Sequence, residues 1–518
     1  MSGATLRVRA ARLPGRPDLV DLAVQDGRFT SVAPHDPGTT AAPVDVEIDA
    51  AGALVSPPFV EPHIHLDATL TAGEPRWNAS GTLWEGIAVW SERKPDVTRD
   101  DVLDRAEQVL RWQAAHGVLH VRSHCDVTDP RLVALDALVE LRDRVRDVIG
   151  LQIVAFPQEG IVSFPDGEKL LEEAVRRGAD VVGAIPHFED TREDGVRSIE
   201  VAVDLAERYD RLVDAHCDEI DDEHSRFVEV LATQALRRGM GERVTASHTT
   251  AMGSYGGAYA YKLERLLSRS GINLVSNPLV NLALQGRFDS YPKRRGLTRV
   301  KEMLAAGVNV AFGSDDVMDP WFPLGTANPL LLAHTGVVAA QMTGQPEIAE
   351  TFAMVTERAA RVLHLGDRYG LRVGARADLV VLPASTRLDA VRRQVAPRWV
   401  VAAQMTGQAE IAETFAMVTE RAARVLALGQ EYGIEAGRPA SFVVLPASSP
   451  MDAIRRQVRP RWVVAHGRVV ASAEPAPARL RWLGTEVDVD FVRSRDEAGT
   501  GWRAATISTD GGAPGSPD

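Results

Sequence analysis

Short apolar segments alternate with longer stretches of helical periodicity through the central part of the chain. The longer stretches, such as DDVLDRAEQVLRWQAAHG and GEKLLEEAVRRGA, space their apolar residues as amphipathic helices do. The apolar segments are FVEPHIH (59–65), VLHVRSH (118–124), LQIVAF (151–156), DVVGAI (180–185), LVDAHCDE (212–219), RVTASH (243–248), INLVSNP (272–278) and VNVAFGSDD (308–316). Eight strand candidates at roughly 30-residue intervals predict an α/β fold with a (β/α)8 barrel of the TIM type. A doubly wound sheet would give the same local pattern, so the count alone leaves that alternative open.

The residues before the first of these segments predict a separate layer of short strands. Leu6, Val8 and Ala10 alternate with arginines, and a QDG turn precedes the strand-like segment GRFTSVA. Pro57 and Pro58 follow and end this layer, because proline cannot donate a hydrogen bond to a sheet.

The last third of the chain contains an internal repeat of 63 residues. Gln341 and Gln404 give the period (404 − 341 = 63), and Glu347–Leu363 matches Glu410–Leu426 at every position. Each copy, 337–399 and 400–462, predicts an amphipathic helix, a strand, a second helix and another strand. Two copies are too few for a solenoid, which needs about three. We interpret the repeat as a recent tandem duplication or an error of sequence assembly; a designed extension of an interface is the alternative.

Composition and charge narrow the class of protein. The 518 residues include 58 basic and 71 acidic side chains, a net charge of −13, which argues against a nucleic-acid partner. The chain contains no apolar run of about 18 residues, and its first residues lack the apolar core of a signal peptide. The two cysteines, Cys125 and Cys217, cannot build a disulfide framework or a thiolate zinc site. We therefore expect a cytoplasmic protein that binds neither nucleic acid nor membrane.

Histidines and a carboxylate stand at the ends of several predicted strands. His63 and His65 are two residues apart at the end of the first strand, so both side chains point to the same side. His216, His248 and Asp315 end later strands. Side chains at the carboxyl ends of barrel strands converge on one mouth. Imidazoles and a carboxylate in that arrangement suit Zn²⁺ or Fe²⁺.

Long motifs in this same region resemble those of bacterial cytosine deaminases, which belong to the amidohydrolase superfamily of metallo-dependent hydrolases. The motifs are VEPHIHLD, VAFPQEG, GADVVGAIPHFE, HCDEIDDEHSRFVE, VTASHTTAM, NPLVN, LQGRFDSYPKRRG and SDDVMDPWFPLGTAN. The resemblance runs from about residue 55 to 335 and resumes in RRQVxPRWVV near the end.

The resemblance implies a metal-dependent barrel with a flanking β-sandwich formed by the N- and C-terminal segments. On this basis 1–56 is the N-terminal part of the sandwich and 57–336 is the barrel. Residues 337–484 then contribute C-terminal helices and the rest of the sandwich, and 485–518 form a disordered tail.

The resemblance also implies the roles of individual residues. It makes one divalent ion, Fe²⁺ or Zn²⁺, the cofactor, with four ligands: His63, His65, His216 and Asp315. The implied catalytic residues are Glu219 as proton shuttle, His248 as the group that orients the attacking hydroxide, and Asp315 as acceptor of the water's proton. The implied substrate-binding residues are Gln158, Asp316 and Trp321.

The chemistry of two of these residues supports their implied roles. A carboxyl group such as Glu219 can deliver a proton to a ring nitrogen and then assist the departure of ammonia. The bland alternative is that Glu219 belongs to a solvated acidic helix start. The amide of Gln158 offers a donor and an acceptor, which match the O2/N1 edge of a pyrimidine. His124 and His187 also end strands, and roles next to the ligands stay open for them.

The sequence departs from the family pattern at two positions. Ser314 and Ala283 stand where the family has histidines, and both are expected near the mouth. We therefore expect these departures to affect the choice of ring and not the type of reaction. No lysine occurs between Lys169 and Lys262, so the fourth strand cannot supply the modified lysine of two-metal relatives.

The resulting prediction is a hydrolase acting on C–N bonds of cyclic amidines, which converts free cytosine and water to uracil and ammonia in pyrimidine salvage. One alternative keeps the mechanism but changes the ring to isoguanine, an aminotriazine or another amino-substituted heterocycle. A different alternative is an inactive metal-binding protein, disrupted by the C-terminal duplication. Family members tend to assemble, so a homo-oligomer is expected.

Overall fold

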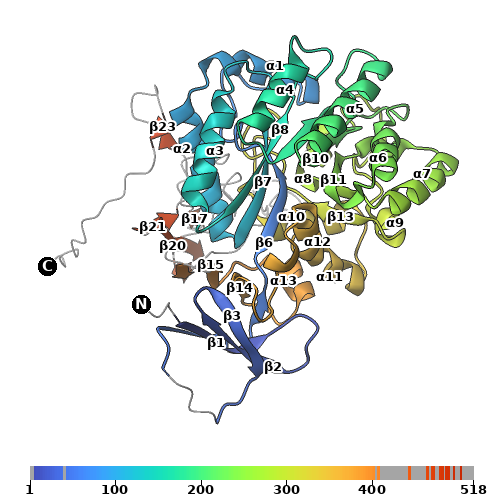
Figure 1. Cartoon of the computed structure of the whole chain (residues 1–518). Helices are drawn as coiled ribbons and strands as arrows, with labels where there is room; N and C mark the ends of the chain where they lie inside the picture. The colour runs from blue at the N-terminus through green and yellow to red at the C-terminus, as the bar shows by residue number, and fades with distance from the viewer. Residues whose placement is uncertain are drawn as a thin grey trace.

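The computed structural model describes residues 5–38 and 43–402 and, beyond them, 405–408, 442–444, 462–465, 468–472, 478–483, 485–489, 494–495 and 502–503. Two large sheets dominate this part of the chain, one surrounded by helices and one below it (Figure 1).

The larger unit is a closed parallel barrel. Its strands follow chain order: β6 (Phe59–Ile64), β7 (Val118–Asp126), β8 (Gly150–Phe156), β9 (Val181–Ala184), β10 (Leu212–Cys217), β11 (Val244–His248), β12 (Asn273–Ser276) and β13 (Asn309–Phe312). A parallel bridge between Ile64 and Asp315 joins the first strand to the last. All eight predicted strands are confirmed, and closure excludes the doubly wound alternative.

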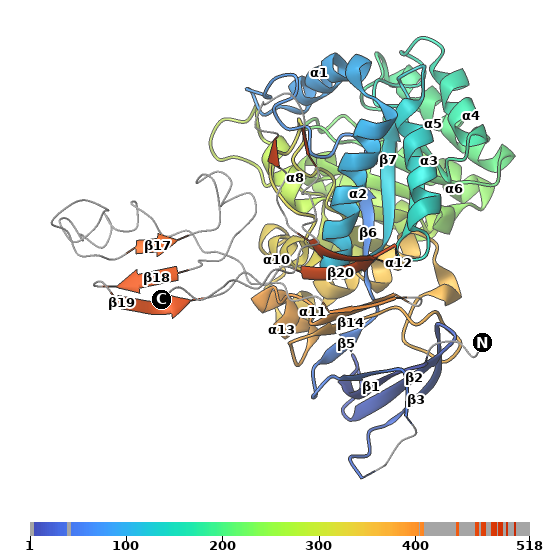
Figure 2. The ribbon, with the colours of Figure 1, turned by 90° about the vertical axis from the view of Figure 1, so that its left-hand side faces the viewer.

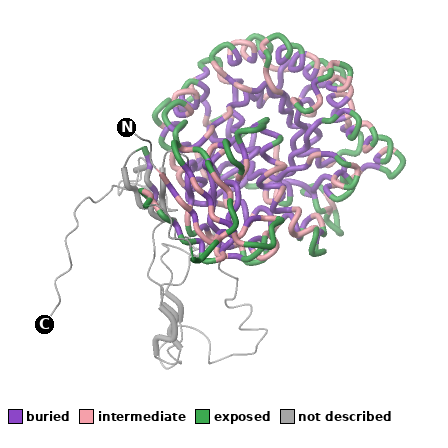
Figure 3. The backbone as a smooth tube through the Cα atoms, turned by 60° about the horizontal axis from the view of Figure 1, so that its bottom comes forward, coloured by how far each residue is buried: buried purple, intermediate pink, exposed green. Residues whose placement is uncertain are grey.

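Helices surround the barrel and bury their apolar faces against its strands (Figure 1). They are α1 (Leu83–Arg93), α2 (Arg99–Ala115), α3 (Val133–Val145), α4 (Gly167–Arg176), α5 (Arg192–Arg208), α6 (Phe227–Arg238), α7 (Gly257–Ser270), α8 (Pro278–Leu284), α9 (Val300–Ala305) and α10 (Pro329–Ala339). Threonine side chains cap α1, α2 and α5, because a hydroxyl oxygen can accept a free N–H of the first turn. Because the helices pack on the strands, the buried residues concentrate in the barrel interior and under the helices (Figure 3).

The second sheet joins strands from the start of the chain to strands that follow the barrel, within residues 379–408. Its strands are β1 (Thr5–Arg12), β2 (Leu19–Gln25), β3 (Arg28–Pro34), β4 (Val46–Asp49), β5 (Leu54–Ser56), β14 (Leu379–Leu382), β15 (Trp399–Ala402) and β16 (Met405–Gln408). The junction lies between β5 and β14, which pair antiparallel with Val55 opposite Val381. Its core includes Val8, Leu22 and Phe29. A flanking β-unit built from both ends is thus confirmed, whereas the domain boundaries stay predictions.

The first repeat copy packs against the barrel. It forms the end of α10, then α11 (Gln345–Met354), α12 (Glu357–Val362), β14, α13 (Arg387–Arg393) and the start of β15. The sequence predicts one helix where the structure has α11 and α12. The break has a physical cause: the Val355 carbonyl accepts the N–H of Val60 on β6 (3.0 Å) and so leaves the helical pattern.

The described part of the second copy repeats one feature of the first. β17 (Phe442–Val444) pairs with β18 (Trp462–Ala465), and Phe442 faces Val464 just as Leu379 faces Val401, 63 residues earlier. With β19 (Arg468–Ser472) these strands form a separate sheet (Figure 2). Most of 400–462 lies outside the described residues.

Four further strands follow in the described part of the chain. They are β20 (Ala478–Trp482), β21 (Thr485–Val489), β22 (Ser494–Arg495) and β23 (Trp502–Arg503). The last three fall within the predicted tail 485–518, whose other residues lie outside the described part. Trp482 on β20 is buried and donates a hydrogen bond to Glu107 on α2 (2.8 Å). Among the described helices, none combines the length and the apolar character that crossing a membrane requires.

Deletion of either repeat copy is expected to leave a folded protein. Removal of 400–462 joins Trp399 to Val463 and keeps the copy that packs on the barrel. Removal of 337–399 replaces it by a copy that is identical over Glu410–Leu426 but carries Arg438 in place of the buried Ala375. It also carries Pro450 in place of Arg387, which pairs with Glu357. We expect both deletion variants to be soluble and the second to melt slightly lower in thermal unfolding. If the second is soluble yet loses the activity of the full chain, the two copies are not equivalent.

Acid is expected to destabilise the fold through His116. Burial lowers the pKa of this side chain to about 3, whereas the pKa of a histidine in the unfolded chain is about 6.5. Between these two pKa values the unfolded chain binds a proton at this side chain and the folded chain does not. The contribution of neutral His116 to the free energy of unfolding is therefore full above about pH 6.5 and is lost as the pH falls toward 3. In melting temperatures between about pH 7.5 and about pH 5, His116→Gln should flatten the decline. The exposed His224→Gln serves as control; equal slopes in the parent and in His116→Gln would contradict the assignment.

Candidate active site

Five polar side chains from four strand ends meet inside the barrel mouth. The Nε2 atoms of His65 and His216 lie 3.1 Å apart. Asp315 Oδ1 lies 3.2 Å from His63 Nε2 and 3.6 Å from His65 Nε2. His248 completes the group, with Nδ1 at 3.7 Å from Asp315 Oδ2. All five side chains are buried.

The chemistry of this group fits a divalent cation. Burial and then the mutual influence of the histidines hold the pKa values of His63, His65 and His216 well below the ordinary value, so their imidazoles are neutral. His63 Nε2 and His216 Nδ1 are buried without a hydrogen-bond partner. Neutral nitrogens that face each other and a carboxylate at such distances would be satisfied by a shared cation. Potential ligand atoms of His63, His216, His248 and Asp315 lie within 4.8 Å of one another.

His248 differs electrostatically from the other three histidines. Burial lowers its pKa, but the facing carboxylates of Glu219 and Asp315 outweigh burial and raise it to about 9. Its Nδ1 lies 3.1 Å from Glu219 Oε1. A protonated imidazole has no free lone pair for a metal ion, so this environment favours His248 as a hydrogen-bond donor to Glu219 and not as a metal ligand.

The backbone is strained at two of these residues. His248 and Asp315 have φ angles of 68° and 64°, in the left-handed region that residues other than glycine seldom adopt. Strain of this kind concentrates at functional sites, where the surrounding structure enforces it.

Glu61 links the first barrel strand to the segment after the last one through hydrogen bonds beside the site. This residue was not identified from the sequence. Its Oε1 accepts the N–H groups of His63 (3.1 Å) and Ser314 (2.9 Å). Burial raises the pKa of this carboxyl group to about 7. A glutamate two residues before the His-x-His pair, on the same face of the strand, is the only signal that the sequence offers for it.

Glu219 is buried within the site rather than solvated at a helix start. Its side chain is 4% exposed, whereas that of Glu223 in the same acidic segment is 59% exposed. Asn281 on α8 donates to Glu219 (3.5 Å) and lies 3.1 Å from His248 Nδ1. Asn281 was not singled out in the sequence, although it ends the motif NPLVN.

A small cavity opens beside this group, and seven of the nine predicted site residues line it. They are His65, Gln158, His216, Glu219, Asp315, Asp316 and Trp321. Apolar walls come from Leu83, Ile185 and Leu284, which sequence reasoning did not identify. The cavity therefore combines a polar floor with aliphatic sides, as small-molecule sites commonly do.

Asp316 sits among other carboxylates. Burial, followed by the charges of Asp319 and Asp315, raises its pKa well above the ordinary value, so its carboxyl group can donate a hydrogen bond. Asp319 accepts the N–H of Trp321 (3.0 Å) and so fixes the loop that carries this ring.

The two departures from the family pattern lie outside the cavity lining. Ser314 is buried, and its N–H binds Glu61. Ala283 lies on α8 one residue before the lining residue Leu284. Of the two other strand-end histidines, His124 stacks its ring on that of His63 at 3.8 Å between centroids. Burial lowers the pKa of His187 to about 4.

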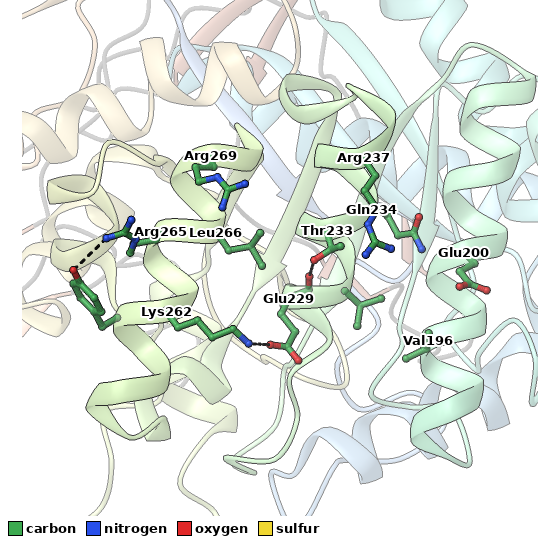
Figure 4. A pocket seen from close by; sticks show the side chains of 12 residues that line it. Val196, Glu200, Glu229, Thr233, Gln234, Arg237, Lys262, Arg265, Leu266 and Arg269 are labelled. Carbon is green, nitrogen blue, oxygen red and sulfur yellow. Dashed lines mark hydrogen bonds and ion pairs between the residues drawn. The ribbon is translucent and has the colours of Figure 1, made fainter.

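A separate groove of about 830 Å³ lies on the outer surface between α5, α6 and α7 (Figure 4). Basic side chains such as Arg237 and Arg269 line it together with the carboxylates of Glu200 and Glu229. Lys262 lies 3.7 Å from Glu229, and none of the predicted site residues is present.

Solved structures and curated proteins similar to this chain include deaminases and an amidohydrolase. A crystal structure of 5-methylcytosine deaminase from Klebsiella pneumoniae, liganded with 5-fluorocytosine, is 50% identical with a TM-score of 0.76, over 79% of this chain and 99% of that one. N-isopropylammelide isopropyl amidohydrolase from Pseudomonas sp. (strain ADP) is 27% identical, over 76% of this chain and 93% of its own. Pterin deaminase from Rhizobium rhizogenes is 29% identical, over 70% and 82%.

The family model described as "Amidohydrolase family" matches residues 46–406, which span the whole barrel and the paired strands β5 and β14 of the second sheet. The protein belongs to the amidohydrolase family and is a hydrolase that acts on C–N bonds.

Proposed function

We propose that this protein is a metal-dependent aminohydrolase that converts free cytosine and water to uracil and ammonia. The observation that carries the proposal is the buried Glu219, which contacts His248 beside the histidine–aspartate group and lines the same cavity as Gln158. The 50% identity to a 5-methylcytosine deaminase supports the same class of ring and the same reaction.

His63, His65, His216 and Asp315 would hold one divalent ion, Fe²⁺ or Zn²⁺. When bound, such an ion lowers the pKa of water from 15.7 to about 7 and so supplies a nucleophile at neutral pH. The protein contributes the rigid strand ends that fix these four side chains.

Glu219 is the proton carrier in this proposal. It takes a proton from the attacking water and delivers it to the ring nitrogen next to C4, which makes C4 electrophilic. The second proton of the water, released as the C4 carbonyl forms, then passes through the same carboxylate to the departing amino group, so that ammonia leaves. The net reaction adds water and releases ammonia, so the carboxyl group ends in its starting state. Contacts with His248 (3.1 Å) and Asn281 (3.5 Å) hold the carboxylate in place.

The cavity matches the polarity of a pyrimidine. The Gln158 amide can donate to the ring's carbonyl oxygen and accept from its neighbouring N–H. Asp316, as a neutral carboxyl group, adds a further donor, and Trp321 supplies a flat wall.

A second substrate is favoured by the aliphatic walls. Leu83, Ile185 and Leu284 give the cavity apolar contacts for which unsubstituted cytosine has no group, whereas 5-methylcytosine has a methyl group. Isoguanine, aminotriazines and other amino-substituted heterocycles stay alternatives, as does an inactive metal-binding protein. A cytoplasmic location and a homo-oligomeric state stay predictions.

Ammonia release from cytosine by the metal-loaded protein tests the proposal directly. Glu219→Gln should lower kcat by about 10²–10⁴-fold, because an amide cannot carry the proton. Glu223→Gln, an exposed carboxylate in the same segment, should leave kcat unchanged. A folded, metal-loaded parent without activity on any of these heterocycles would support the inactive alternative instead.

A comparison of cytosine with 5-methylcytosine tests the aliphatic wall. Loss of one aliphatic contact in a pocket costs about tenfold or more in kcat/KM. Leu284→Ala should therefore lower kcat/KM for 5-methylcytosine more than for cytosine. Leu282→Ala, an exposed leucine on the same helix, is the control. Equal losses for both substrates would show that this side chain does not face the 5-position.

A further inference from the structure

A chain of hydrogen bonds runs through the barrel interior behind the candidate metal ligands. His63 Nδ1 lies 2.9 Å from Ser247 Oγ. The Ser247 hydroxyl donates to Asp214 Oδ1 at 2.7 Å. Arg122 Nη1 donates to the other oxygen of Asp214 at 2.9 Å. The chain connects β6, β11, β10 and β7, and all four side chains are less than 1% exposed.

The donors and acceptors in this chain can be arranged in one way only. The Asp214 carboxylate, paired with Arg122, offers acceptors and no proton. The single hydroxyl proton of Ser247 is therefore used toward Asp214. Ser247 Oγ can then only accept from His63, so His63 must carry its proton on Nδ1. Its Nε2, which lacks a partner and points toward Asp315 at 3.2 Å, is left with a free lone pair.

We propose that Ser247 and Asp214 are positioning residues that fix the tautomer and orientation of His63 and so prepare its Nε2 to bind the metal. This inference rests on the proposed role of His63 as a ligand. It does not depend on which heterocycle the enzyme deaminates.

The placement of these residues along the chain agrees with this role. Asp214 precedes His216 by two residues on β10, so both side chains point into the barrel. Ser247 faces the interior of β11 one residue before His248, where the backbone turns to a positive φ. Groups that hold the second nitrogen of a metal-binding imidazole raise metal affinity because they restrict ring rotation and tautomer exchange.

Metal affinity of the full-length protein is the primary test. Apo protein is titrated with Zn²⁺ against a chelator of known affinity. Ser247→Ala should weaken Zn²⁺ binding by about 10–100-fold. Ser247→Thr, which keeps the hydroxyl, should restore affinity toward that of the parent. The matched control is Ser276→Ala, which removes a buried strand hydroxyl that has no hydrogen-bond partner in the described structure.

The tautomer of His63 provides a second readout, which a merely structural role would not move. In long-range ¹⁵N–¹H spectra of histidine-labelled apo protein, the signal lost in His63→Gln should show a protonated Nδ1. Ser247→Ala should shift that signal toward exchange between the two tautomers.

Two outcomes separate the failure of this inference from the failure of the proposed site. If His63→Gln abolishes Zn²⁺ binding but Ser247→Ala binds Zn²⁺ as tightly as the parent, the positioning role is overturned. If neither substitution changes Zn²⁺ affinity, His63 is not a ligand, and the proposed metal site itself is wrong.

Discussion

Two backbone hydrogen bonds at the seam of the barrel hold the site together. The N–H of Asp315 donates to the His63 carbonyl (2.8 Å), and the N–H of His65 donates to the Asp315 carbonyl (2.9 Å). These bonds close the sheet at the very residues that are proposed to bind metal. Because the seam fixes the backbone of β6 relative to the segment after β13, the geometry of the site follows from barrel closure. Glu61 strengthens the same seam with its carboxylate.

Buried polar groups set the second constraint on this interior. A barrel core normally consists of branched apolar side chains, and polar groups there destabilise the fold unless they are paired. Here an arginine, an aspartate and several histidines occupy the interior, and each contact between them restricts the others. The hydrogen bonds among these side chains offset the free energy lost when they leave water, and they also orient the imidazole of His63. Structural and functional demands therefore coincide in the same side chains.

The sequence predicts most of this architecture because parallel strands are local signals. Several apolar segments end in polar residues that the strand carries to the mouth, so the convergence of His216 and His248 could be predicted without a structure. Contacts between residues that are distant in the sequence have no local signal of this kind. The contacts of Asn281 with Glu219 and of Glu61 with Ser314 were therefore not predicted, and the structure reveals them. The nonapeptide VVAAQMTGQ shows the limit of local reasoning. At 337–345 its first residues end a helix, whereas at 400–408 it forms two paired strands, β15 and β16. Tertiary surroundings decide between these structures.

Arg122 extends the interior network to the C-terminal segment. While one of its nitrogens binds Asp214, Nη2 donates to the carbonyl of Val362 on α12 (2.6 Å). Gln152, which accepts from Arg122, reaches the next carbonyl, that of Leu363. Both recipients are main-chain atoms, so the segment is recognised by its backbone path and not by its side chains. During evolution, substitutions in this segment can accumulate without weakening the anchorage. An insertion or deletion that shifts the backbone path would instead disturb Arg122 and, through Asp214 and Ser247, the hydrogen bond to His63.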